Sequence, residues 1–309
     1  LCQSVSSPSR ATTSITPPFY PEPVLLCVGD LIEDVVVWLP GPVALGSDTV
    51  VRITRERGGS AANAAAAAVR TGGRARFVGQ LGDDELAHRL LHGLAMTGVD
   101  VVARHGGRTG SIVVLVDSTG ERTMLTDRAA ATELAAAEPE WLVGVDVLHL
   151  PAYSLFVERL AKSCLALAAM ARERGIPVAI DPSSSALLEH YGIARFKALL
   201  AEVQPAILFP NADEAALLLS DGRPPEGVDL VVEKHGPDAV RLITIEGVTE
   251  VPVPLVTGVV DTTGAGDAFA AGFLVAWTAG KPTVECVARG SETAAHVLRG
   301  PGGDAWAPA

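Results

Sequence analysis

The chain has 309 residues, 48% of them hydrophobic and 19% charged, and its formal net charge is −12. This length suits one large α/β domain or two smaller ones, with ample material for a core. The acidic balance argues against nucleic-acid and anionic-membrane partners, since both need basic patches. Four well-separated cysteines form no CxxC pair, which predicts reduced thiols and a cytoplasmic location.

The N-terminal segment, residues 1–23, is rich in Ser, Thr and Pro and lacks the apolar run of a secretory signal. We therefore expect a flexible leader, followed by one domain over residues 24–309. Val24–Val28 predicts a strand that stops at Gly29. Residues 35–54 mix β-branched residues with Pro and Gly, and residues 110–127 contain a hairpin turn signal. Both segments favour exposed strands that form a small β-lid.

Beyond residue 129, apolar strands alternate with helices. The strands are expected at 145–150, 177–180, 206–209 and 228–233, and two helices at 266–279 and 283–298. This alternation indicates a mostly parallel central sheet covered by helices on both faces, an α/β fold. In such sheets ligands bind outside the carboxyl ends of the strands, where Asp30, Asn211 and Asp261 are expected.

A motif near the C-terminal end, Asp-Thr-Thr-Gly-Ala-Gly-Asp from Asp261 to Asp267, indicates a site for anionic charge. Its glycines allow a tight turn, and the turn opens a helix, whose free N–H groups and positive dipole end attract anions. Asp267 is expected at the rim of this turn as a carboxylate. A base beside an anion hole is what phosphoryl transfer to an alcohol requires. The alternative is a helix cap after an ordinary turn, but the length of the motif favours the functional interpretation.

A second glycine-then-helix motif runs from Gly58 through Gly59 to Asn63. Its backbone N–H groups and the Asn63 amide would offer a polyol both donors and acceptors. An ordinary helix start with a buried Asn is an equally good interpretation. Asp34, placed just after the first strand, is either a sugar contact that accepts two hydroxyl protons or a solvated acid on a lid strand.

Two further motifs follow strands. Asn211 and Glu214 have the spacing of a helix capping box, and alternatively they would hold the hydration shell of Mg²⁺ beside phosphates. Lys234 is either a partner of a nucleotide phosphate or a surface lysine, and Gly236 would let the chain pass under the nucleotide.

Together and in this order, these motifs resemble the PfkB (ribokinase-like) family of carbohydrate kinases, from about Val24 to Arg299. The resemblance implies a three-layer α/β/α sandwich with a β-lid. It also implies transfer from ATP, with Mg²⁺, to a primary hydroxyl of a sugar or sugar-like substrate. In this scheme Asp267 is the general base, and Gly264, Ala265 and Gly266 form the anion hole.

The same resemblance assigns the remaining site residues. The implied sugar contacts are Asp34, Gly58, Gly59, Asn63 and Glu133. The implied nucleotide contacts are Asn211, Lys234, Gly236 and Thr262. Glu214 would hold Mg²⁺ through water, while Asp261 and Thr263 match positions that help to form a monovalent-cation site, for K⁺, in several members.

Some positions depart from the family pattern. His235 precedes Gly236 where Thr is frequent in ribokinases proper, and Ala239 stands where a second Gly is usual. The segment 299–303 does not align clearly with the part that completes a potassium site. K⁺ activation therefore stays open at this point.

Other functions also stay open. The acceptor is alternatively a nucleoside or a sugar phosphate, for which Arg104, Arg108 and Arg128 flank the lid hairpin. A non-catalytic sugar-binding or regulatory relative is a further alternative, although such a protein needs neither Asp267 nor Glu214. The expected partners are a small sugar and ATP. A homodimer through the lid strands is one alternative and a monomer is the other.

Overall fold

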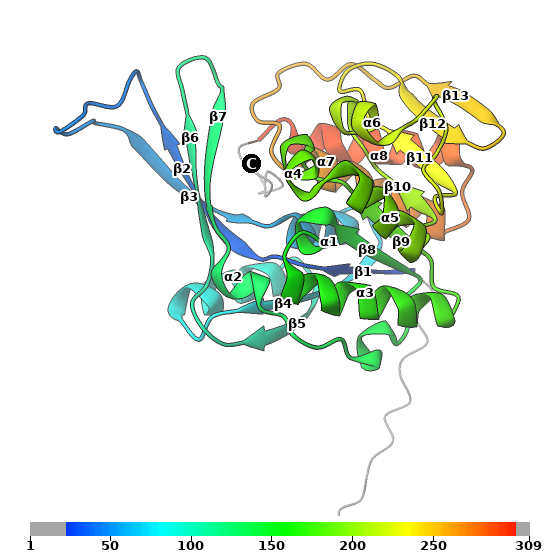
Figure 1. Ribbon diagram of the computed structural model, residues 1–309. Coiled ribbons are helices and arrows are strands. Elements are labelled where there is room, and N and C mark those ends of the chain that lie inside the picture. The colour runs from blue at the N-terminus through cyan, green and yellow to red at the C-terminus, as the bar shows by residue number, and fades with distance from the viewer. Residues whose placement is uncertain (1–22, 301–309) are drawn as a thin grey trace, which may run out of the picture.

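The computed structural model describes residues 23–300 of the chain, and Figure 1 shows their arrangement. A nine-stranded central sheet has the order β13-β12-β11-β10-β9-β8-β1-β4-β5. The strands from β11 to β5 are parallel, and the β12–β13 hairpin joins the β11 edge in antiparallel fashion. The strands are β1 (Val24–Val28), β4 (Arg74–Leu81), β5 (Asp100–His105), β8 (Val147–Pro151), β9 (Val178–Asp181), β10 (Ile207–Leu208), β11 (Leu230–Glu233), β12 (Val240–Thr244) and β13 (Gly247–Val251).

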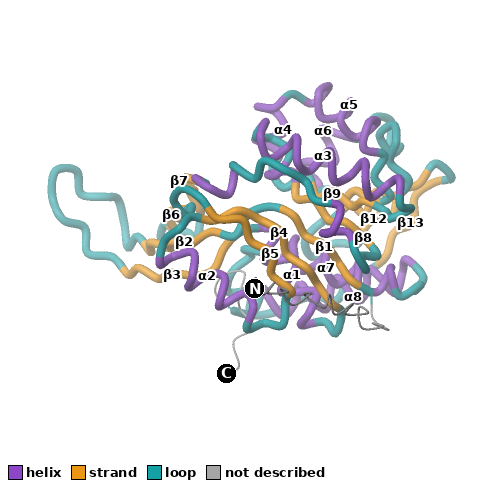
Figure 2. The backbone as a smooth tube through the Cα atoms, turned by 90° about the horizontal axis from the view of Figure 1, so that it is seen from below, coloured by secondary structure: helices purple, strands orange, loops and turns teal. Residues whose placement is uncertain are grey.

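Helices cover both faces of this sheet, as Figure 2 shows. One layer contains α1 (Ser60–Arg70), α2 (Glu85–Ala95), α7 (Ala265–Thr278) and α8 (Thr283–Val297), and the other contains α3 (Glu158–Glu173), α4 (Ser185–Tyr191), α5 (Ile193–Val203) and α6 (Ala212–Leu218). Each layer buries its own apolar cluster against the sheet. The first is built around Phe77 and Phe273, and the second around Phe196 and Leu148. The expected three-layer α/β/α sandwich is confirmed.

The alanine run explains how one helix lies deep in the molecule. Every alanine from Ala61 to Ala68 is buried in α1, and these small side chains allow α1 to pack closely against the sheet and α7. Gly59, which precedes α1, has φ +104, and a Cβ there would overlap with the carbonyl group of Asp30. This close approach, which only glycine permits, places the start of α1 beside the end of β1.

A second, four-stranded sheet, here called the small sheet, projects from the body (Figure 1). Its order is β3-β2-β6-β7, with β2 (Ile32–Trp38), β3 (Arg52–Gly58), β6 (Ser111–Val116) and β7 (Arg122–Asp127). Strand alternation sends Ile112 and Val114 to the inner face and Val113 and Leu115 to the outer face. Asp34, expected just after the first strand, lies within β2, on the inner face of the small sheet.

Several sequence-based expectations concern the termini and thiols. The described part of the chain excludes residues 1–22 of the predicted leader, which contain Cys2, and residues 301–309. The other cysteines, Cys27, Cys164 and Cys286, are buried free thiols. Among residues 23–300, no helix has the length and apolar character needed to cross a membrane.

Candidate active site

A cleft of about 770 Å³ opens between the inner face of the small sheet and the carboxyl edge of the central sheet. It gathers most of the residues singled out in the sequence. The predicted residues that line it are Asp34, Gly59, Asn63, Asn211, Glu214, Lys234, Gly236, Thr262, Thr263, Gly264, Ala265, Gly266 and Asp267. Gly58, Glu133 and Asp261 do not line it, and their positions are described below.

Asp267 lies in the first turn of α7, directly after the turn at Gly264, which has φ +74. Burial raises the pKa of the Asp267 carboxyl to about 8, and the negative charge of Asp181 acts in the same direction. A hydrogen bond from Asn63 and the charge of Lys234 oppose this rise. Asp267 is therefore a carboxyl whose pKa lies close to neutrality, as suits a group that exchanges protons with a substrate.

A buried chain of side chains orients this carboxyl. Arg57 Nη1 donates to Asn63 Oδ1 at 3.1 Å, which turns the amide NH₂ group toward Asp267 Oδ2, 3.4 Å away. Asn63 therefore lines the cleft, and its amide NH₂ group donates to Asp267. Sequence reasoning missed Arg57. The only signal was its position immediately before the Gly58-Gly59 pair.

At the end of the cleft beside the small sheet, Asp34 is the principal acidic group. Burial raises its pKa to about 7, and the charges of Asp30 and Glu56 act in the same direction. Gly58 lies opposite this carboxylate, and a Cβ there would overlap with it. Gly58 thus leaves room for the Asp34 side chain and does not face the cleft.

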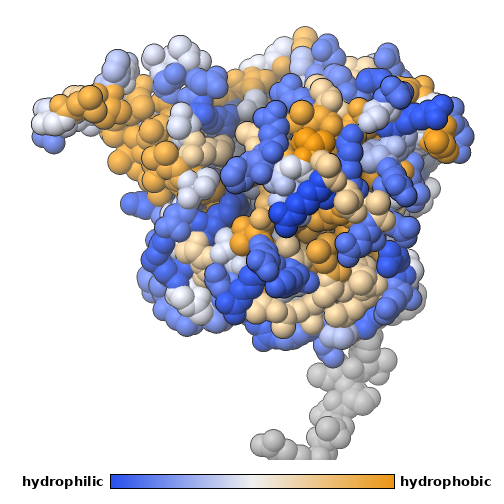
Figure 3. Space-filling model, viewed as in Figure 1, coloured by the Kyte–Doolittle hydropathy of each residue, from blue (hydrophilic) through white to orange (hydrophobic). Residues whose placement is uncertain are grey.

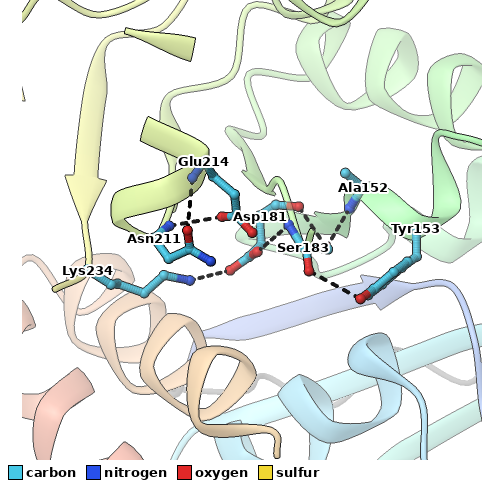
Figure 4. Close-up of polar contacts among 7 residues, drawn as sticks. All are labelled: Ala152, Tyr153, Asp181, Ser183, Asn211, Glu214 and Lys234. Atoms are coloured by element: carbon cyan, nitrogen blue, oxygen red, sulfur yellow. Dashed lines mark hydrogen bonds and ion pairs between the residues drawn. The ribbon is translucent and has the colours of Figure 1, made fainter. Parts of the chain in front are cut away.

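An ion pair also lies at this end of the cleft, beside the small sheet. Arg128 forms an ion pair with the buried Asp30 and lies 4.3 Å above the centre of the Tyr153 ring. Tyr153 Oη donates to the carbonyl oxygen of Ser183 at 3.1 Å, and Ser183 N donates to Asp181 Oδ1 at 2.8 Å. These bonds run from Tyr153 through Ser183 to Asp181, as Figure 4 shows.

The opposite end of the cleft is built around Asp181, the last residue of β9 (Figure 4). Its Oδ2 accepts from Lys234 Nζ at 2.6 Å. Asn211 and Glu214 form the expected capping box of α6, with both bonds at 2.9 Å, and both also line the cleft. Burial raises the pKa of Glu214 to about 7, with a further contribution from the charge of Asp181. Sequence reasoning missed Asp181, although an Asp directly after a predicted strand was a usable signal.

Lys234 also stands over the glycine turn, since a Cβ on Gly266 would lie 3.4 Å from Lys234 Nζ. Ala265 N donates to the carbonyl oxygen of Thr262 at 3.2 Å, and the next N–H groups of the first turn of α7 have no intrahelical acceptors. A lysine ammonium beside such N–H groups forms a site for an anion. Lys234 therefore lies beside the turn, and its role as a phosphate contact stays a prediction.

The predicted monovalent-cation ligands, Asp261 and Thr263, bind the guanidinium of Arg122. Arg122, at the start of β7, forms an ion pair of 2.7 Å with Asp261 Oδ1 and donates to Thr262 Oγ1 at 2.7 Å and to Thr263 Oγ1. Asp261 Oδ1 also accepts from the N–H and the hydroxyl of Thr263, both at 2.8 Å. In this arrangement Asp261 and Thr263 do not fit a K⁺ ion, because a guanidinium already engages them.

Glu133 lies away from the cleft. Its side chain is 46% exposed and pairs with Arg159 Nη1 at 2.7 Å, so the structure does not bring it to the predicted sugar site. Arg104 pairs with Glu138, and Arg108 pairs with Asp127 at 2.5 Å. Of the three arginines that flank the hairpin, only Arg128 lines the cleft.

Comparisons with known proteins show which family model, relatives and solved structures this chain is similar to. The model of a family described as pfkB family carbohydrate kinase matches residues 24–309. An ATP-dependent ribose-1-phosphate kinase from Halopiger xanaduensis is 33% identical over 247 residues, covering 76% of this chain and 78% of that protein. The structure of adenosine kinase from Sinorhizobium meliloti has a TM-score of 0.80 and 25% identity, covering 91% of this chain and 95% of that one. A structure from E. coli in complex with ATP and Mg²⁺ shares the fold, with a TM-score of 0.79 and 20% identity over 91% and 94% of the two chains.

Proposed function

From the premise that this chain belongs to the pfkB family of carbohydrate kinases, we propose that it transfers the γ-phosphoryl group of ATP to a primary hydroxyl of a neutral sugar or sugar-like alcohol. One observation carries the proposal. Asp267 lies where the two ends of the cleft meet, with the glycine turn on one side and Asn63 on the other, and burial raises its pKa to about 8.

The chemical step is a direct in-line displacement. The Asp267 carboxylate takes the proton of the sugar hydroxyl while the hydroxyl oxygen bonds to the γ-phosphorus, and the bond to the bridging oxygen of ADP breaks. The N–H groups of the turn at Gly264–Gly266 and the ammonium of Lys234 stabilise charge on the transferring group. Asn63 keeps Asp267 aimed at the hydroxyl.

The residues beside Asp181 suit a hydrated divalent cation. Two carboxylates, Asp181 and Glu214, face the cleft near the amide of Asn211, and the charge of Asp181 contributes to the raised pKa of Glu214. A cation would relieve this repulsion. Within residues 23–300, no three His, Cys, Asp or Glu side chains form a direct metal cage, which favours binding through water, as Mg²⁺ prefers. Bound Mg²⁺ would neutralise part of the phosphate charge.

The charges at the other end of the cleft support a neutral acceptor. Asp30, Asp34 and Asp267 contribute carboxyl groups there, and Arg128, the lining arginine at this end among residues 23–300, is already paired with Asp30. A sugar phosphate would bring two further negative charges to these carboxyls. The Asp34 carboxylate is suited to accept two hydroxyl protons from one sugar.

The small sheet, hereafter the lid, closes over the acceptor and excludes water, which would otherwise compete for the phosphoryl group. Its outer face suits a homodimer contact. Ile53 and Leu125 are each 55% exposed there, beside Val113 and Leu115, and Figure 3 shows apolar side chains gathered over this sheet. Light scattering on the wild type and on an Ile53→Glu variant tests the dimer, and a monomeric wild type would exclude it.

The function is tested by measuring ADP release across a panel of neutral sugars, ribose 1-phosphate and adenosine. A neutral sugar is expected to give the largest rate. Asp267→Asn should leave sugar binding nearly intact and lower turnover at least ~100-fold, the usual effect of losing a general base. Sugar binding without turnover in the wild type would favour the non-catalytic alternative. A preference for ribose 1-phosphate or adenosine would move the acceptor to that class.

A further inference from the structure

The side chain of Arg122 connects the lid to the segment that precedes the glycine turn. Its guanidinium contacts Asp261, Thr262 and Thr263, the three residues that precede the turn, although 139 or more positions separate them along the chain. Both partners of the ion pair are largely buried, because the side chain of Arg122 is 22% exposed and that of Asp261 is 14% exposed. This contact is therefore shielded from solvent more than an ordinary surface pair.

The lid presents this arginine from a preformed turn. Asp117 Oδ1 accepts from Thr119 N at 2.8 Å, from Thr119 Oγ1 at 2.6 Å and from Glu121 N at 3.0 Å. Arg122 begins β7 directly after this turn and pairs in register with Val116 of β6. The backbone of Arg122 is thus held at the tip of the hairpin by bonds that do not involve the Asp261 segment.

The chemistry of the contact matches its place. A planar guanidinium can meet one carboxylate and several hydroxyl oxygens at once, which an ammonium or a spherical ion does less well. Asp261 also binds Thr263 through both the N–H and the hydroxyl group. A cation at Asp261 therefore fixes the conformation of the backbone segment that leads into Gly264.

We propose that Arg122 is the built-in cation of the phosphate-binding turn, so that lid closure itself orders this turn and no added monovalent cation is needed. The consequence for catalysis rests on the proposed kinase function. Arg122 acts through Asp261 and Thr263 and is a positioning residue. The turn is complete only when the lid hairpin lies against it, which links closure over the acceptor to formation of the donor site.

Two measurements test the proposal. The first is hydrogen exchange of the ligand-free protein for Arg122→Gln, Asp261→Asn and the double variant. Each single variant should speed amide exchange both in the hairpin, residues 117–126, and in the turn, residues 261–267. The double variant should add little to either single change, because both remove the same contact. Arg108→Gln, which removes an exposed pair with Asp127 on the same hairpin, should leave both segments unchanged.

The second measurement is kinase activity in KCl, NaCl and tetramethylammonium chloride at equal ionic strength. The wild type should be equally active in all three. Arg122→Gln should raise KM for ATP roughly 10- to 100-fold, the range for a lost hydrogen bond to a charged group, and KM for the sugar should change less. Severalfold activation of the wild type by K⁺, or unchanged exchange of both segments in Arg122→Gln, would overturn the proposal. The exchange measurement needs no substrate, so its outcome is independent of whether the kinase function holds.

Discussion

The carboxylate of Asp34 occupies the space that a side chain at residue 58 would fill. A Cβ built on Gly58 would overlap with the carboxyl carbon and both oxygens of Asp34. β2 and β3 pair so that Ile32 faces Gly58 and Asp34 faces Glu56. Asp34 can therefore occupy its position in the cleft only because residue 58 has no side chain. The backbone flexibility of Gly58 matters less here.

Gly58→Ala should displace the Asp34 carboxylate and raise KM for the sugar. Losing a hydrogen bond to a charged group corresponds to a change of roughly 10- to 100-fold. KM for ATP should stay near the wild-type value, because the donor end of the cleft is unaffected. Steady-state kinetics with each substrate varied in turn would check this. Gly93→Ala is the matched control, since a Cβ at this glycine in α2 meets nothing within 4 Å. Equal sugar KM values for both variants would contradict the assignment.

The pH dependence of kcat/KM should show a limb on the acidic side. Burial raises the pKa of Asp267 to about 8 and those of Asp34 and Glu214 to about 7. Each carboxyl must be ionised to work as a base or an acceptor, so activity is present above these pKa values and is lost as the pH falls through them. kcat/KM reports the free enzyme, and it should fall at least tenfold per unit well below pH ~7. A profile that stays flat down to pH ~6 would be inconsistent with a base of raised pKa.

Much of the fold followed from local sequence patterns. The alanine run predicted α1, and the apolar run of β1 predicted a strand that stops at Gly29. Residues within one motif also kept their expected relation, as Asn211 and Glu214 do in the capping box. Such features depend on neighbours a few positions apart, and the amino acids in that window largely determine them.

The missed residues depend on contacts between distant segments. Arg57 matters because α1 carries Asn63 beneath it, and Asp181 matters because β9 ends next to Lys234. Arg122 lies in the same predicted hairpin as many exposed polar residues, and only the position of that hairpin over Asp261 distinguishes it. Single-sequence periodicity contains no information on these pairings. Glu133 shows the opposite error, since a position assigned by family resemblance lies on the surface beside Arg159.

Lys234→Gln should move the acidic limb of the pH profile to higher pH. The positive charge of Lys234 lowers the pKa of both Asp267 and Glu214, so its removal allows both values to rise. Turnover at pH 7 should fall, and part of the loss should be recovered by raising the pH. Lys197→Gln is the control, because Lys197 does not line the cleft and its Nζ donates only to Ser220 among the bonds described. An unshifted limb in Lys234→Gln would mean that Lys234 does not set the charge of the site.

Asn211→Ala should weaken both a helix end and the donor site. Oδ1 of Asn211 accepts a hydrogen bond from Glu214 N at 2.9 Å. In return, Asn211 N donates to Glu214 Oε2 at 2.9 Å. Loss of the cap should cost about 1 kcal/mol of unfolding free energy. Because the cap also fixes Glu214, the Mg²⁺ concentration needed for half-maximal activity should rise. Ser184→Ala removes the side-chain cap of α4, whose acceptor bond to Leu187 N is 3.4 Å, and should lower stability without changing the Mg²⁺ requirement. An equal Mg²⁺ requirement in the two variants would separate Asn211 and Glu214 from the metal and leave them as a helix cap.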